Sequence, residues 1–167
     1  GGGEAPFLLV TGPNMGGKST LLRQVCLATV LAQVGACVPA DGMELSIVDA
    51  IYVRMGAKDA IMAGQSTFFI ELNETAAVLR HATEHSLVAL DELGRGTATT
   101  AGRAIAGAVM EHILEDLQCR TLFSTHYRSL ADPLKAAGRV AIKHMGCSVG
   151  RADPNDAAAV PDVAFLC

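Results

Sequence analysis

Aromatic residues are scarce in this sequence of 167 residues, where they make up 4% of the total, and tryptophan is absent. Charged residues are also few, at 18%, whereas hydrophobic residues reach 50%. The core must therefore be built largely from Ala, Val, Leu and Ile. A chain of this length and apolar content argues against intrinsic disorder and predicts one domain with a real core.

Three further absences exclude classes of protein. The chain has no excess of basic residues, and its net charge of −4 disfavours a free-standing nucleic-acid-binding module. No apolar run approaches the ~18 residues of a membrane span, because polar residues interrupt the most apolar stretch, 21–34. The five cysteines include no C-x-x-C pair, which indicates reduced thiols in a cytosolic or nuclear protein instead of disulfides or a zinc site.

Strand-like and helix-like segments alternate along the chain. Strands are predicted at 7–10, 47–55, 86–90, 120–124, 139–149 and 163–166. Helices are predicted at 19–34, 66–83 and 99–117. The apolar face expected for the second helix comprises Phe68, Leu72, Thr75, Ala76 and Leu79. This alternation predicts an α/β fold with a mostly parallel sheet between helices, whose ligands bind beyond the carboxyl ends of the strands.

A glycine-rich segment follows the first predicted strand and opens the first predicted helix. It reads Gly12-Pro13-Asn14-Met15-Gly16-Gly17-Lys18-Ser19 and matches G-x-x-x-x-G-K-[ST] in full. Glycines let backbone N–H groups turn toward phosphate oxygens, and the amino end of a helix adds partial positive charge. Lys18 would contact the β- and γ-phosphates, and Ser19 would supply a hydroxyl ligand for Mg²⁺. The alternative, a glycine-rich turn without function, is disfavoured by the strand before it and the helix after it.

Polar residues also follow two later strands. Asp91 would hold Mg²⁺ through water, and the adjacent Glu92 would orient or deprotonate the attacking water. Two acids beside a phosphate repel it unless a cation lies between them, so the pair indicates a metal. His126, after the strand at 120–124, could contact the γ-phosphate, although a lone histidine at such a turn is more often an ordinary polar residue.

These segments resemble the ATPase domain of the MutS family of DNA mismatch repair proteins. The resemblance rests on four motifs in the family's order, namely 11–20, Ser66-Thr67-Phe68-Phe69-Ile70-Glu71-Leu72, Asp91-Glu92-Leu93-Gly94-Arg95-Gly96-Thr97 and Ser124-Thr125-His126-Tyr127. It extends from about residue 7 to residue 166. The sequence is most similar to the eukaryotic subunit that reads base mismatches as half of a heterodimer, including its plant-type relatives.

The resemblance implies a P-loop NTPase of the ABC type, in which each ATP is held between two subunits. The nucleotide-binding residues would be Gly12, Pro13, Asn14, Met15, Gly16, Gly17, Lys18, Ser19 and Thr20. Mg²⁺ would be held by Ser19 and Asp91, and the catalytic residues would be Glu92 and His126. Ser66 would contact the ATP of the partner, a second MutS-homologue subunit.

Other implied properties concern the whole protein. Members of the family bind mismatched duplex DNA through other domains, and ATP converts the dimer into a clamp that slides on DNA. The implied location is the nucleus, and no membrane is involved. We expect residues 1–167 to be this ATPase domain, truncated before its carboxyl-terminal dimerisation segment. The isolated piece would then bind ATP with little turnover.

One stretch departs from the family's pattern, and two alternatives remain open. Thr100-Ala101-Gly102 stands where the family usually has an aromatic residue or histidine followed by Asp-Gly. The change at Ala101 bears on coupling between subunits and not on nucleotide binding. The chain could instead be a non-hydrolysing scaffold for interactions, or another ABC-type ATPase such as a transporter or chromosome-organising subunit. Those ATPases carry a Leu-Ser-Gly-Gly-type signature, which this chain lacks.

Overall fold

A parallel β-sheet forms the centre of the molecule. The computed structural model describes residues 5–13, 16–56, 67–131, 139–149 and 163–166. The main sheet has five strands in the order β2-β3-β4-β1-β5, and every neighbouring pair is parallel. These strands are β1 (Phe7–Thr11), β2 (Ile51–Arg54), β3 (Leu87–Asp91), β4 (Arg120–Ser124) and β5 (Val140–His144). The predicted α/β fold with a mostly parallel sheet is confirmed.

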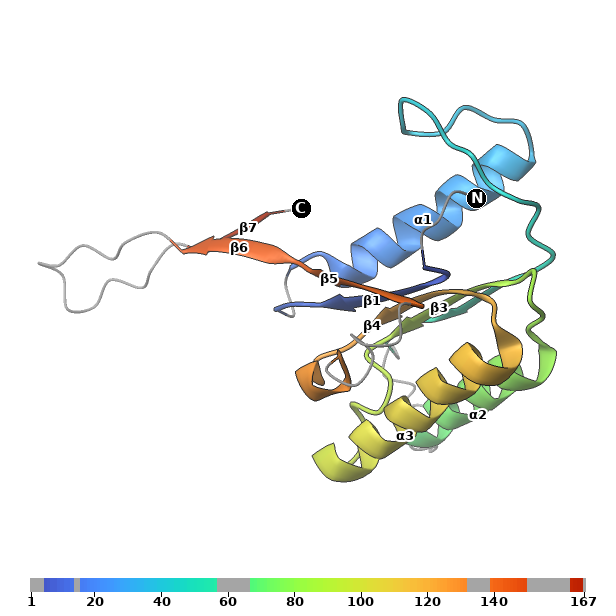
Figure 1. The fold of residues 1–167 in the computed structure, drawn as a ribbon. Coiled ribbons are helices and arrows are strands. Elements are labelled where there is room, and N and C mark those ends of the chain that lie inside the picture. The colour runs from blue at the N-terminus through green and yellow to red at the C-terminus, as the bar shows by residue number, and fades with distance from the viewer. Residues whose placement is uncertain (1–4, 14–15, 57–66, 132–138, 150–162, 167) are drawn as a thin grey trace, which may run out of the picture.

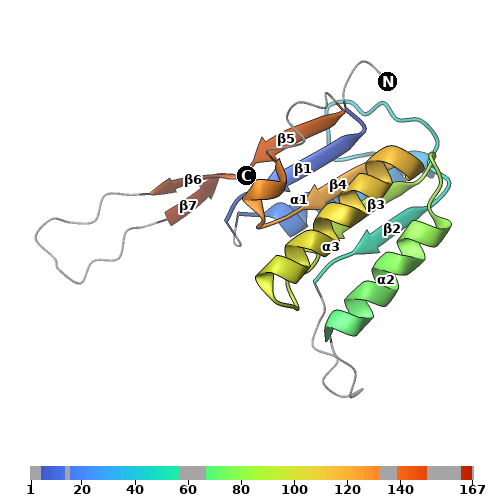
Figure 2. The same cartoon turned by 60° about the horizontal axis from the view of Figure 1, so that its bottom comes forward.

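Helices cover both faces of this sheet (Figure 1). Helix α1 (Lys18–Gln33) lies on one face. Helices α2 (Thr67–His81) and α3 (Thr99–His112) lie side by side on the other face, which Figure 2 turns toward the viewer. An antiparallel hairpin of β6 (Gly146–Val149) and β7 (Val163–Leu166) projects from the main sheet beyond β5.

Strands β1, β3 and β4 each contribute to two cores because successive side chains point to opposite faces of the sheet. Leu9 and Leu90 are fully buried in the core beneath α2 and α3. Val10 and Ala89 are fully buried in the core beneath α1, together with Leu22 of that helix. Burial on both faces explains why β1 and β3 appear as continuous apolar runs in the sequence.

Three predicted elements differ in extent from those observed. The strand predicted at 47–55 is reduced to β2 because side chains hold the preceding residues, as where Gln33 accepts the N–H of Val48 at 2.6 Å. The segment predicted as one strand at 139–149 divides into β5 and β6, because β1 ends at the residue that pairs with His144 and offers no further partner. The helix predicted at 99–117 ends in a turn of π-helix, Ile113–Leu117.

Side-chain hydrogen bonds also organise the amino-terminal end of β2, around Asp49. Thr83 Oγ1 donates to its Oδ2 at 2.5 Å, and Ser86 Oγ donates to its Oδ1 at 2.7 Å. These two bonds hold the pKa of Asp49 below its usual value of 3.8, and the bond from Thr83 is the larger cause. Hydrogen bonds to a carboxylate favour its charged form, which is the physical reason for this direction.

A lowered pKa in the folded state makes stability depend on pH. The ionised Asp49 contributes stability above its unfolded pKa, and this contribution is lost as pH falls through the lower folded value. We therefore expect Asp49→Asn to have a lower free energy of unfolding than wild type at neutral pH. The difference between the two free energies should become smaller below about pH 4, where Asp49 of the wild type becomes protonated. Urea unfolding of wild type and Asp49→Asn between neutral pH and acidic pH measures this change. A difference in the free energy of unfolding that stays constant with pH would contradict the prediction.

Candidate functional site

The chain turns sharply between β1 and α1. Gly12 has φ +139° and Gly17 has φ +83°, both in a region that favours glycine. A Cβ atom at Gly12 would lie 2.9 Å from Cβ of Met145, so the close approach of the chain after β5 also requires glycine there. Gly16 donates its N–H to the carbonyl of Pro13 at 3.0 Å, which closes the turn. Asn14 and Met15 lie outside the described residues.

Lys18 begins α1 and its side chain folds back into this turn. Its side chain is 2% exposed, and Nζ donates to the carbonyl oxygens of Gly12 at 3.0 Å and Pro13 at 2.9 Å. Nζ also lies 3.5 Å from Glu92 Oε1, after β3. A buried ammonium group is costly unless it has partners of this kind. The structure therefore holds one positive charge inside the loop at the amino end of α1.

Asp91 ends β3 and faces the same turn. It is buried, and its Oδ2 accepts a hydrogen bond from Ser19 Oγ of α1 at 2.6 Å. Its Oδ1 accepts from Ser124 Oγ at the end of β4. One carboxylate thus joins the ends of β3 and β4 to the first turn of α1. Thr20, the next residue of that turn, is exposed.

Glu92 follows Asp91 in a conformation with φ +50°, which is uncommon for a residue other than glycine. Its N–H donates to the carbonyl of Ser124 at 3.1 Å, which fixes the backbone at the end of β3. Its carboxylate lies between Lys18, at 3.5 Å, and Arg95 Nη1, at 2.5 Å. Arg95 is 61% exposed, so only one of the two cations around Glu92 is held in place by burial.

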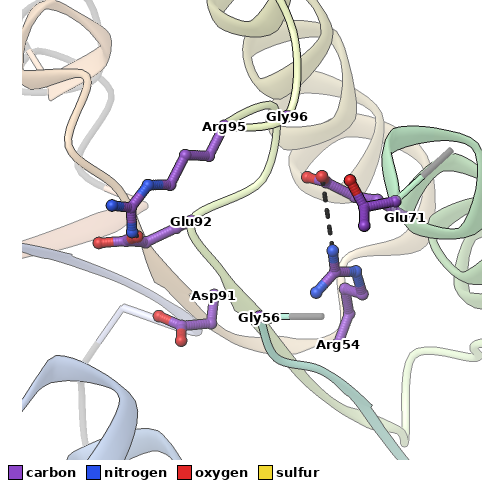
Figure 3. Close-up of a pocket in the computed structure, with 8 residues that line it drawn as sticks. Arg54, Gly56, Glu71, Asp91, Glu92, Arg95 and Gly96 are labelled. Atoms are coloured by element: carbon purple, nitrogen blue, oxygen red, sulfur yellow. Dashed lines mark hydrogen bonds and ion pairs between the residues drawn. The ribbon is translucent and has the colours of Figure 1, made fainter. Parts of the chain in front are cut away.

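A cavity of about 360 Å³ opens beside these residues (Figure 3). It lies between the carboxyl ends of β2 and β3, the loop after β3, and the first turns of α2. Its lining carries charges of both signs and consists of Arg54, Gly56, Thr67, Glu71, Asp91, Glu92, Arg95 and Gly96. The cavity therefore lies beyond the carboxyl ends of β2 and β3, and its lining includes Asp91 and Glu92 but none of the described residues of the turn between β1 and α1.

Two further residues were predicted as part of the site, His126 and Ser66. His126 follows β4, is exposed, and lies against Tyr127, with ring centroids 3.9 Å apart and the rings tilted by 41°. Within the described part of the chain, no hydrogen bond or ion pair joins His126 to Lys18, Asp91 or Glu92. Ser66 lies outside the described residues, directly before the start of α2. The structure thus brings together Lys18, Ser19, Asp91 and Glu92.

Three residues at this edge of the sheet were not predicted as part of the site. Glu71 of α2 is 4% exposed and accepts the N–H of Gly94 at 2.6 Å. Arg54, also 4% exposed, ends β2 and lies 3.4 Å from Glu71. Tyr127 donates to the carbonyl of Gly94 at 3.0 Å. The sequence carries a weak signal for one of them, since Glu71 is an acid surrounded by the apolar residues Phe69, Ile70 and Leu72.

The described residues contain neither a cluster of metal-binding side chains nor a helix that could span a membrane. No group of three or more His, Cys, Asp or Glu side chains within the described ranges could hold a metal ion. A metal at Asp91 would therefore depend on oxygen ligands of other kinds. None of the described helices combines the length and the hydropathy needed to cross a membrane.

The chain is similar to known proteins over most of its length. The family model described as MutS domain V matches residues 8–160. The chain is 63% identical over 151 residues to the DNA mismatch repair protein MSH6 of Arabidopsis thaliana, covering 90% of this chain and 11% of that protein. It is 56% identical over 147 residues to the DNA mismatch repair protein Msh6 of Homo sapiens, covering 88% and 11%. It is 53% identical over 160 residues to the DNA mismatch repair protein MSH7 of Arabidopsis thaliana, covering 95% and 14%. The chain thus spans only 11% to 14% of the length of these curated relatives.

Proposed function

The chain belongs to the MutS family, and from that premise we propose that it is the ATP-binding and ATP-hydrolysing domain of a DNA mismatch repair protein. The resemblance to eukaryotic members found in the sequence is confirmed. One observation carries the proposal: a buried lysine and two acidic residues meet at the carboxyl edge of the sheet, with Lys18 3.5 Å from Glu92 and Ser19 2.6 Å from Asp91. We further propose that the fold is a P-loop NTPase of the ABC type.

ATP would bind at the turn between β1 and α1. The backbone N–H groups of this turn and the amino end of α1 favour an anion. Lys18 donates to two backbone carbonyls there, and phosphate oxygens would take the place of these neutral acceptors. Charged acceptors make stronger hydrogen bonds with an ammonium group than neutral carbonyls do. Gly12, Pro13, Asn14, Met15, Gly16, Gly17, Lys18, Ser19 and Thr20 are the proposed nucleotide-binding residues.

The oxygen atoms around Asp91 fit a magnesium ion. A serine hydroxyl and a carboxylate already meet at 2.6 Å, and both are hard oxygen ligands of the type that Mg²⁺ prefers. Mg²⁺ commonly uses only one or two protein oxygens and completes its shell with water and phosphate, so a larger cluster is not required. Ser19 and Asp91 would hold it. When bound, the ion neutralises charge on the phosphates.

Glu92 is the proposed catalytic residue for hydrolysis. Its carboxylate borders the cavity, and its backbone is fixed by the bond to Ser124. It would accept a proton from the attacking water or orient that water. Lys18 and Arg95 now flank this carboxylate, and Arg95 is free to move because its side chain is 61% exposed. His126, exposed on the loop after β4, is proposed to contact the γ-phosphate.

The wider assignments rest on family membership. We propose that the whole protein pairs with a second MutS-homologue subunit, and that Ser66 contacts the partner's ATP. Mismatched duplex DNA would bind through domains outside this chain, in the nucleus, with ATP controlling binding and sliding. Membership of the MutS family disfavours the alternative of a transporter or chromosome-organising ATPase.

The role of Asp91 leads to a test that does not depend on hydrolysis. We expect wild type to bind a fluorescent ATP analogue more tightly with Mg²⁺ than in EDTA. Asp91→Asn should lower the apparent affinity for Mg²⁺ about 10- to 100-fold, which is the usual effect of losing a residue that holds a metal through its bound ligands. The measurement is a titration of Mg²⁺ at fixed analogue and protein.

A matched control distinguishes the metal from general damage. Asp116→Asn makes the same change at an exposed aspartate of the π-helical turn, where it pairs with His112 instead of the site. We expect it to behave as wild type. Equal Mg²⁺ dependence in Asp91→Asn and wild type would exclude Asp91 as the ligand, and no nucleotide binding by wild type would exclude the proposed function.

A further inference from the structure

The loop that carries Glu92 is held at Gly94, two residues later, by two hydrogen bonds from different segments of the chain. The N–H of Gly94 donates to Glu71 Oε1 of α2 at 2.6 Å. The carbonyl of Gly94 accepts from Tyr127 Oη, after β4, at 3.0 Å. Both bonds are buried and join segments 23 and 33 residues away in sequence. We call Glu71, Gly94 and Tyr127 the Gly94 clamp.

The side chain of Glu71, which belongs to α2, is held in place by a second partner. Its second oxygen, Oε2, lies 3.4 Å from Arg54 Nη2, and both side chains are buried (Figure 3). Arg54 Nε lies 3.0 Å from Glu74 Oε2, one turn further along α2. A buried carboxylate that holds one cation and one backbone N–H has its lone pairs directed by both. Arg54 thus orients Glu71 toward Gly94.

Tyr127 is suited to the other side of the clamp. Its ring is buried, and burial together with the negative charge of Glu71 raises the pKa of the Tyr127 phenol. The hydroxyl therefore stays protonated and remains a donor to the Gly94 carbonyl. Because Tyr127 follows β4, its hydrogen bond to Gly94 joins the loop after β4 to the loop after β3.

The backbone at Gly94 leaves little room for adjustment. Gly94 has φ +86° and packs directly against Gly102 in the first turn of α3. A Cβ atom added to either glycine would overlap the backbone of the other. The loop between Glu92 and Gly94 therefore has a fixed end, which is held by this packing together with the two hydrogen bonds of the clamp.

We propose that Glu71 and Tyr127 are positioning residues for Glu92, which hold Gly94 and thereby set the Glu92 carboxylate beside Lys18. This inference rests on the proposed function, since the position of Glu92 matters for hydrolysis. Neither residue is placed at the turn that would bind the phosphates. Their loss should therefore slow the chemical step without weakening ATP binding, because small displacements of a catalytic group reduce rate strongly.

The clamp also connects α2, through Gly94, to the loop that carries Glu92. Helix α2 begins at Thr67, directly after Ser66, the residue proposed to contact the partner's nucleotide. A shift of α2 along its axis would move Glu71, and with it Gly94 and the loop that carries Glu92.

The test compares two tyrosine variants in the full-length protein. Tyr127→Phe removes the hydroxyl that bonds to Gly94. Tyr52→Phe removes a hydroxyl that bonds to the carbonyl of His81 at the same distance, 3.0 Å, at the far end of α2. We expect Tyr127→Phe to lower the single-turnover rate of ATP hydrolysis about 10-fold, with an ATP Kd within about 2-fold of wild type. Tyr52→Phe should retain the wild-type rate.

Variants of Glu71 provide a second measurement. Glu71→Gln keeps an oxygen that accepts the Gly94 N–H, whereas Glu71→Ala removes it. We expect Glu71→Ala to lower the rate of ATP hydrolysis and Glu71→Gln to retain most of it, with the ATP Kd little changed in either variant. If Glu71 were purely structural, both variants would instead have a lower Tm, and the rate and the Kd would change together. Equal rates in Tyr127→Phe and Tyr52→Phe would overturn the clamp while leaving the ATPase intact. Wild type that binds but does not hydrolyse ATP would overturn both.

Discussion

Replacing Lys18 with alanine is expected to weaken ATP binding by about 100-fold or more. Hydrogen bonds to charged groups contribute roughly 1.5–3 kcal/mol each, and Lys18 Nζ is placed to make more than one with the phosphates. The side chain is held at the amino end of α1 by the carbonyls of Gly12 and Pro13, and it is 2% exposed. Its loss would also leave Glu92 with Arg95 as its remaining cation.

A second lysine gives the control for this change. Lys143 lies on β5, beside the strand that precedes the turn, and its side chain is exposed. Equilibrium titration with labelled ATP and Mg²⁺ should show wild-type affinity for Lys143→Ala and little binding for Lys18→Ala. Equal affinity of the two variants, with thermal unfolding showing both folded, would refute the proposed phosphate site.

Replacing Glu92 with glutamine is expected to lower the rate of ATP hydrolysis about 100- to 1,000-fold, the usual contribution of a general base. Glutamine keeps the size of the side chain but cannot accept the proton of the attacking water. Binding of ATP should change less than about 3-fold, because the turn at Gly12 and the Ser19–Asp91 pair are unaltered. The measurement is steady-state phosphate release by the full-length protein with its partner.

The control for Glu92 is an acid of the same type far from the site. Glu84 follows α2 and its side chain is 74% exposed, so Glu84→Gln should hydrolyse ATP as wild type does. An unchanged rate in Glu92→Gln would remove Glu92 from the chemistry. Absence of turnover in wild type, with ATP bound normally, would instead favour the non-hydrolysing scaffold.

Local signals made much of the fold and the centre of the site predictable. Strands β1 and β3 are short, largely apolar runs, as expected for strands that are buried on both faces. Lys18 and Ser19 belong to a contiguous motif, and Asp91 and Glu92 follow a strand directly. Their meeting at one edge follows from parallel strands alone, since all carboxyl ends then lie together.

Long-range contacts explain what the sequence did not predict. The expected apolar face of α2 included Ala76, which is exposed, while the helix buries Glu71, Thr75 and Val78. A buried acid is tolerated there because Arg54 and the N–H of Gly94 satisfy it. Both partners come from segments that only the folded sheet brings near α2, so periodicity along the helix could not reveal them.

The strand order also fixes when the site can assemble during synthesis. Strand β1 precedes the other four strands of this sheet in the sequence, and among the described residues Phe7 pairs with Thr121 of β4 and Val140 of β5. In the nascent chain, the strand before the turn at Gly12 therefore has no neighbouring strand of this sheet until more than a hundred residues have followed it. Pairings this distant form slowly. In a nascent chain that ends before β4, β1 would be unpaired, and the strand that connects β1 to β3 in the sheet would be missing.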